Sequence, residues 1–181
     1  MITSWIIIIV LLLIMGSGLI HNFNVLFRHQ APFIPSRRRA LKAISAELNL
    51  QDGQVFFELG AGSAPLLRRL ARQYSQVRFV GVEYSLIPWV IGTLLCLPHR
   101  NIKIIKQNFW QTDLSQADYI YCFLNVRVMR ELENKFKTNC KPGVTIISYI
   151  FKLPHIEPSK TLELGHEKIY FYKINNIDNN D

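Results

Sequence analysis

The pattern of hydrophobic and polar positions begins with an apolar segment. Residues 1–20 contain no charged side chain, and as a helix they would be long enough to cross the hydrocarbon core of a bilayer, which is about 30 Å thick. Trp5 stands near one end, where interfacial aromatic residues occur. A cleaved signal peptide is the alternative, but it would need basic residues before the apolar run. We therefore expect residues 1–27 to form a transmembrane anchor and its exit.

Beyond residue 50, short apolar runs alternate with stretches of helical spacing. A helix at 36–48 precedes this region, and Ser36 is its expected N-cap. The predicted strands lie at 55–59, 79–83, 102–105, 119–124 and 144–149, and the predicted helices between them lie at 64–73, 88–97 and 126–136. Ser63 and Pro65 suit the start of the helix at 64–73. This alternation is typical of a mostly parallel sheet covered by helices on both faces.

The remaining segments complete the predicted domain organisation. Residues 162–164 and 169–174 flank Gly165-His166 and predict a closing antiparallel strand pair. Residues 28–50 form a basic linker and the first helix, 51–174 the ligand-binding domain, and 175–181 an Asn- and Asp-rich tail expected to be disordered. The apolar helix, taken as residues 86–97, is too short to span a bilayer. We expect it to lie in the core, with docking on a membrane surface as the alternative.

The net charge of the chain predicts an anionic partner. Lys and Arg number 21 against 13 Asp and Glu, which gives a net charge of +8. Arg37, Arg38 and Arg39 follow the apolar segment and no basic residue precedes it, so the positive-inside rule predicts a single-pass protein. Its domain would lie on the cytoplasmic side, or on the matrix side in a mitochondrion. The same arginines are expected to contact anionic lipid. A nucleic-acid partner is not expected, because aromatic residues do not interleave with the basic ones.

The cysteines and histidines show no metal-binding pattern. The three cysteines form no C-x-x-C pair, and the five histidines are scattered along the chain. Zinc sites need closely spaced pairs of such ligands. We therefore expect no metal site.

The first predicted strand ends in a candidate ligand-binding loop. The sequence there reads Glu58-Leu59-Gly60-Ala61-Gly62-Ser63, and Glu83 ends the second predicted strand, 21 residues after Gly62. The glycines allow a sharp turn and a close approach of the backbone to a ligand, and the following helix presents free N–H groups. A carboxylate at the end of the second strand can accept both hydroxyls of a ribose. Together these features predict a nucleoside site.

Two residues decide which nucleoside is expected. The dinucleotide motif G-x-G-x-x-G needs a third glycine, and Pro65 occupies that position. Glu58 would repel a pyrophosphate but would pair with a cationic amino group. S-adenosylmethionine carries an ammonium and a sulfonium and no phosphate. The charges therefore favour S-adenosylmethionine over a nicotinamide dinucleotide.

At these residues the sequence resembles the class I S-adenosylmethionine-dependent methyltransferases. That family has E/D-x-G-x-G at the end of its first strand and an acid at the end of its second, within a Rossmann-like sheet. The resemblance implies that the methionine part is held by Glu58, Gly60, Ala61 and Gly62. It further implies that Glu83 binds the ribose and that Tyr84 lies beside the adenine. Asn108, where the family often has an acid, and Phe109 are the expected adenine contacts after the third strand.

A narrower resemblance covers roughly residues 31–174. The segment Pro32-Phe33-Ile34-Pro35-Ser36 resembles the P-Y/F-V-P-S/T entry motif of membrane-anchored protein-lysine methyltransferases. These are related to the mitochondrial enzymes that modify the ATP synthase c-subunit and the adenine nucleotide translocase. The resemblance implies methylation of a lysine in a membrane-associated protein. The chain departs from the group at Phe123, where the group usually has Tyr, and at Val126, where Pro is common.

Phe123 and Asn125 are the candidate substrate-facing residues, because they follow the fourth predicted strand. A core aromatic residue and a helix N-cap are the alternative roles. No general base is evident, but an apolar slot lined by Tyr121, Phe123 or Tyr149 would favour a neutral lysine amine. Methylation of RNA or of a small molecule is the alternative activity. A membrane-tethered protein that binds the cofactor but catalyses weakly is the non-enzymatic alternative.

Overall fold

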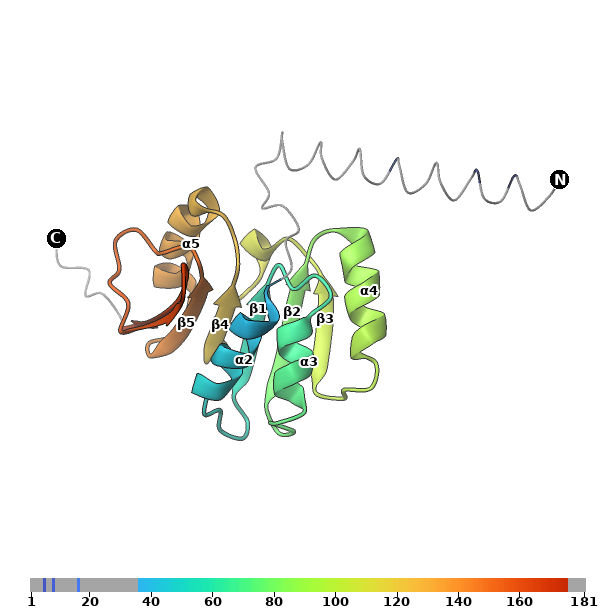
Figure 1. Cartoon of the computed structure of the whole chain (residues 1–181), viewed down its shortest axis with the longest axis horizontal. Coiled ribbons are helices and arrows are strands. Elements are labelled where there is room, and N and C mark those ends of the chain that lie inside the picture. Colours follow the sequence, from blue (N-terminus) through green and yellow to red (C-terminus); the bar gives the residue numbers. More distant parts are fainter. Residues whose placement is uncertain (1–4, 6–7, 9–15, 17–35, 176–181) are drawn as a thin grey trace. The chain divides into compact units, whose positions relative to one another are not determined.

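The computed structural model describes Trp5, Ile8, Gly16 and residues 36–175. Residues 36–175 form an α/β domain built around one sheet (Figure 1). Within the described part of the chain, no helix combines the length and apolar character needed to cross a membrane. Apart from Trp5, Ile8 and Gly16, the anchor expected at 1–27 lies outside the described residues, and so does the tail after Asn175.

The sheet has seven strands in the order β3-β2-β1-β4-β5-β7-β6. The first five strands pair in parallel, and β7 lies antiparallel between β5 and β6. This arrangement confirms the mostly parallel sheet with a C-terminal antiparallel pair. The strands are β1 Val55–Leu59, β2 Arg78–Glu83, β3 Ile102–Lys106, β4 Tyr119–Cys122, β5 Val144–Tyr149, β6 Lys160–Leu164 and β7 Glu167–Ile174.

Helices cover both faces of the sheet, and the direction of the crossovers decides which face each one covers. The steps from β1 to β2 and from β2 to β3 run one way along the sheet, whereas the step from β4 to β5 runs the other way. Right-handed crossovers therefore place α3 and α4 on one face and α5 on the opposite face, and α2 packs beside α3 (Figure 1). The helices are α2 Arg38–Glu47, α3 Pro65–Ala71, α4 Leu86–Cys96 and α5 Val126–Asn139.

The predicted serine caps are wrong. Helix α2 begins after Arg37 and α3 after Ala64, and neither N-cap residue makes a side-chain hydrogen bond to its helix. Ser36 instead lies 2.7 Å from the Tyr121 hydroxyl, measured from Oγ to Oη. Ala64 has φ of 51°, in the left-handed region, because the loop turns sharply before Pro65. Pro65 does open α3, since it has no N–H that would need a partner there.

The prediction that the apolar helix lies in the core is wrong for most of α4. Only Gly92 and Cys96 of its residues are buried. The helix packs on β2 and β3 at one end of the sheet, and within the described residues no further layer covers its outer side. Its inner side approaches the glycine loop so closely that a Cβ on Gly92 would lie 2.4 Å from the Gly62 carbonyl oxygen.

Candidate cofactor site

The glycine loop is fastened to the end of β2. The backbone N–H groups of Gly60 and Ala61 both donate to the Val82 carbonyl, at 2.9 Å and 3.0 Å. Gly60 and Gly62 have φ of 73° and 54°, which side chains with a Cβ rarely adopt. The loop thus turns between the carboxyl ends of two neighbouring strands, where open α/β sheets bind their ligands.

Glu83 holds the loop from the neighbouring strand. One of its carboxylate oxygens accepts the Gly62 N–H at 2.9 Å, and the other accepts the Ser85 N–H at 2.7 Å. The side chain is buried, with 8% of the residue exposed. The two groups that lie 21 residues apart along the chain are therefore in direct contact, and Glu83 positions the loop as well as ending the strand.

Glu58 lies one residue before the end of β1 and is almost fully buried, at 4% exposure. Its Oε2 has no hydrogen-bond partner. Burial raises the pKa of this carboxyl from 4.5 to about 8, and the Glu83 charge adds to the rise. A hydrogen bond from the Leu67 backbone and the charge of Arg68 act in the opposite direction. A buried carboxyl with an unpartnered oxygen beside a glycine loop suits a cationic ligand group.

The residues predicted to surround the adenine follow β2 and β3. Tyr84 comes directly after Glu83 and is 36% exposed. The Gln107 N–H donates to the Glu83 carbonyl at 3.0 Å, which brings the segment after β3 beside the end of β2. Asn108 caps the short helix η1 (Phe109–Gln111) by accepting the Trp110 N–H at 3.1 Å. Phe109 is half-buried, so the structure brings these predicted residues to the same edge of the sheet as Glu83.

The two candidate substrate-facing residues follow β4, which pairs with β1. Phe123 is half-buried, and its ring centroid lies 4.7 Å from that of Tyr149 and 6.2 Å from that of Phe151. The Asn125 Oδ1 accepts the Val128 N–H at 2.9 Å and caps α5. Asn125 therefore fills the alternative role of helix cap, whereas Phe123 packs against the core but stays half-buried. They still lie at the carboxyl edge of the strand next to Glu58.

An ion-pair cluster at the same edge was not predicted from the sequence. Glu167, the first residue of β7, pairs with Arg37 at 2.9 Å and with Arg39 at 2.8 Å. It also accepts a 2.5 Å hydrogen bond from the Tyr149 hydroxyl. These contacts hold the start of α2 against the end of β5 and the start of β7. No sequence signal could identify Glu167, because its basic partners are 128 or more residues away.

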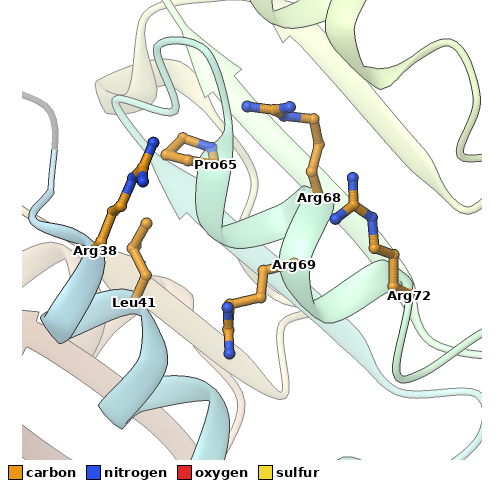
Figure 2. Close-up of a pocket in the computed structure, with 6 residues that line it drawn as sticks. All are labelled: Arg38, Leu41, Pro65, Arg68, Arg69 and Arg72. Atoms are coloured by element: carbon orange, nitrogen blue, oxygen red, sulfur yellow. The ribbon is translucent and has the colours of Figure 1, made fainter.

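The cluster changes the expectation for the three consecutive arginines. Arg37 and Arg39 both form ion pairs with Glu167. Arg38 instead lines a cavity of about 270 Å³ between α2 and α3, together with Arg68 and Arg69 of α3 and Arg72, which follows that helix (Figure 2). None of the residues predicted to bind the cofactor lines this cavity.

Metal-binding side chains do not gather at the site. Within residues 36–175, no three or more His, Cys, Asp or Glu side chains are grouped so that they could hold a metal ion.

A reversed seventh strand, a glycine loop at the end of β1 and an acid at the end of β2 are the features expected from the resemblance to class I S-adenosylmethionine-dependent methyltransferases. A family model, described as ANTKMT methyltransferase domain, matches residues 58–160. This match covers more than half of the chain, and the chain belongs to that family. It is a methyltransferase, and S-adenosylmethionine is its cofactor.

Similar curated proteins share about a fifth of their residues with the chain. A protein-lysine N-methyltransferase of Saccharolobus islandicus is 22% identical over 79% of this chain and 93% of its own length. A lysine N-methyltransferase of Rattus norvegicus, named for the ATP synthase C-subunit, is 22% identical over 79% of this chain. Adenine nucleotide translocase lysine N-methyltransferase of Mus musculus is 22% identical over 83% of it. The alignments cover 66% of the rat and mouse proteins.

Solved structures show the same fold. An RNA methyltransferase from Salinibacter ruber, in complex with S-adenosyl-L-homocysteine, superposes with a TM-score of 0.76 at 18% identity. That alignment covers 82% of this chain and 98% of the other. A methyltransferase from Aquifex aeolicus superposes with a TM-score of 0.59 at 14% identity, over 74% of this chain and 88% of its own.

Proposed function

We propose that the chain methylates a lysine side chain of a membrane-associated protein. The observation that carries the substrate class is the set of curated relatives: all three described above are named as lysine N-methyltransferases. Two of them are named for their targets, an ATP synthase component and a nucleotide translocase. The apolar segment at 1–20 supports a target at a membrane, because a tethered enzyme meets such targets at a raised effective concentration.

The residues at the glycine loop fit this cofactor. The unpartnered Oε2 of Glu58 would accept a hydrogen bond from the amino group of the methionine part. The backbone from Gly60 to Gly62 would lie against that part, and Glu83 would take the ribose hydroxyls. Tyr84, Asn108 and Phe109 would border the adenine. The bound cofactor supplies a methyl group on a positively charged sulfur, which a neutral amine can displace.

The chain's part in the reaction is alignment and desolvation. A free lysine amine has a pKa of about 10.4 and must lose its proton before it can attack. Phe123, Tyr149 and Phe151 form an aromatic cluster at the end of β4 and β5. An amine held against these rings is removed from water, which disfavours its charged form. Alignment of the amine with the methyl group accounts for the rest of the expected rate enhancement.

The proposed placement is a single N-terminal membrane span with the catalytic domain on the cytoplasmic or matrix side. It is supported by the uncharged stretch at 1–20 and by the arginines that follow it. The tether would be tested by extraction of membranes with carbonate, which releases peripheral proteins and leaves spanning ones in the pellet.

Activity is tested with the full chain and methyl-labelled S-adenosylmethionine added to a membrane fraction. We expect label in a protein band and a methylated lysine on peptide mass spectrometry. Glu83→Ala should abolish labelling, whereas Glu131→Ala, a change at an exposed residue of α5, should not. Label that enters RNA or lipid would replace the lysine assignment with the alternative substrates. Cofactor binding without any labelled product would favour the tethered binding protein.

A further inference from the structure

The outer face of α4 is apolar and exposed to an unusual degree. No charged residue occurs from Ser85 to Pro98. The exposed fractions run from 40% to 71% over seven aliphatic residues: Leu86, Ile87, Val90, Ile91, Leu94, Leu95 and Leu97. On the inner side Gly92 and Cys96 are buried, and the Trp89 indole donates a hydrogen bond to the Ile104 carbonyl of β3 at 3.3 Å. Contiguous exposed apolar surface of this kind marks a contact with a protein or a membrane.

The same layer of helices is basic beside this face. Arg38 of α2, Arg68 and Arg69 of α3 and Arg72, the residue after α3, surround the cavity between those helices (Figure 2). Within residues 36–175 none of these four arginines forms an ion pair, and the Arg68 Nε is buried without a hydrogen-bond partner. Neither α3 nor α4 contains an acidic residue. The surface formed by α3 and α4 is therefore complementary to a partner that is both apolar and negatively charged.

Charge complementarity selects among the possible partners. A second copy of the chain would bring its own arginines against these, and like charges at an interface are unfavourable. The chain's own segment at 1–20 is apolar but carries no acid, so it would leave the arginines unmatched. An anionic bilayer offers acyl chains for the aliphatic face and phosphate groups for the arginines.

We infer that α4 lies in the surface of an anionic membrane and that the arginine cavity between α2 and α3 takes lipid phosphate. This second contact would orient the domain, which an N-terminal tether alone would leave free to rotate. Helix α4 begins shortly after Glu83, and Gly92 packs on the glycine loop. Docking would therefore place the cofactor edge of the sheet next to the lipid surface, where a membrane-embedded target presents its lysine.

The test uses the full chain in vesicles and a position-specific probe. An environment-sensitive NBD label is attached at Leu94→Cys, in a Cys140→Ser background because Cys96 and Cys122 are buried. The matched control carries the label at Glu131→Cys, on α5 at the opposite face of the sheet. The vesicles contain phosphatidylcholine with phosphatidylglycerol and a nitroxide-labelled acyl chain as quencher.

We expect the label at position 94 to be quenched several-fold more than the label at 131. Arg69→Glu with Arg72→Glu, or vesicles of phosphatidylcholine alone, should reduce the difference. Equal quenching at both positions, or none at 94 in chains that float with the vesicles, would overturn the docking and leave the N-terminal tether standing. A spectral shift at 94 without vesicles that grows with protein concentration would assign the face to a second copy instead. The readout needs no methyl transfer, so it is independent of the proposed activity.

Discussion

Replacing Glu58 with glutamine separates the cost to stability of burying this carboxyl from its proposed role in binding the cofactor. Burial raises its pKa from 4.5 to about 8 in the folded chain. At pH 7 the folded chain therefore keeps Glu58 protonated, whereas the unfolded chain ionises it. The gap of about 2.5 pH units, at about 1.4 kcal/mol per unit, lowers the free energy of unfolding by about 3 kcal/mol relative to a neutral side chain. Glutamine carries no such cost.

The pH dependence of this effect has a fixed sign. Below pH 4.5 the carboxyl is neutral in both states, so the parent and Glu58→Gln should unfold alike. The parent then loses stability relative to the variant as the pH rises, until about pH 8, where the folded carboxyl ionises too. At pH 7 we expect the ligand-free variant to melt roughly 6–12 °C higher. Thermal unfolding of the full chain in detergent, followed by tryptophan fluorescence at pH 5, 7 and 8.5, measures the difference.

Cofactor binding should favour the parent over Glu58→Gln, although the variant is the more stable of the two at pH 7. A cationic amino group needs the ionised carboxylate, so binding at pH 7 should release close to one proton, and the affinity should rise nearly tenfold from pH 6 to pH 7. Calorimetry in phosphate and in Tris detects the proton through the buffer's ionisation enthalpy. Glu58→Gln should release none and bind roughly 10- to 100-fold more weakly. A variant that binds as tightly as the parent, or that gains no stability at pH 7, would refute the assignment. Glu131→Gln serves as the exposed control.

Three further changes test the packing around the site. Gly92→Ala puts a Cβ 2.4 Å from the Gly62 carbonyl oxygen; it should cost about 1–3 kcal/mol of stability and weaken cofactor binding by calorimetry, unlike Leu94→Ala on the exposed side. Glu167→Gln should lower the melting temperature at pH 7, and the difference should vanish on acidification, because the pKa of this carboxyl is held below 4.5 mainly by the hydrogen bond from Tyr149; an unchanged melting temperature would contradict this. Asn125→Ala should cost about 1 kcal/mol in urea unfolding through the lost cap. Asn125→Asp should restore stability, and loss of activity in that stable variant would show a role beyond capping.

The order of strands and helices, the glycine loop and its two acids could be predicted from the sequence. Each depends on a local pattern. The buried strands need short, mostly apolar runs such as 55–59, and the turn after them needs residues that tolerate positive φ. The acids were placed by their distance from the loop along the chain. The capping role of Asn125 was left open beside a substrate role, and the structure shows the cap.

Only the tertiary structure decided how these parts meet. Ser36 contacts Tyr121 across 85 residues instead of capping its own helix, and Glu167 gathers two arginines and Tyr149 from distant segments. Helix α4 has the composition of a core helix, yet its place beside β2 and β3 leaves one side without a covering layer. The physical reason is common to all three cases: composition and spacing fix what a segment can form, but burial and pairing depend on which distant segment the fold brings against it.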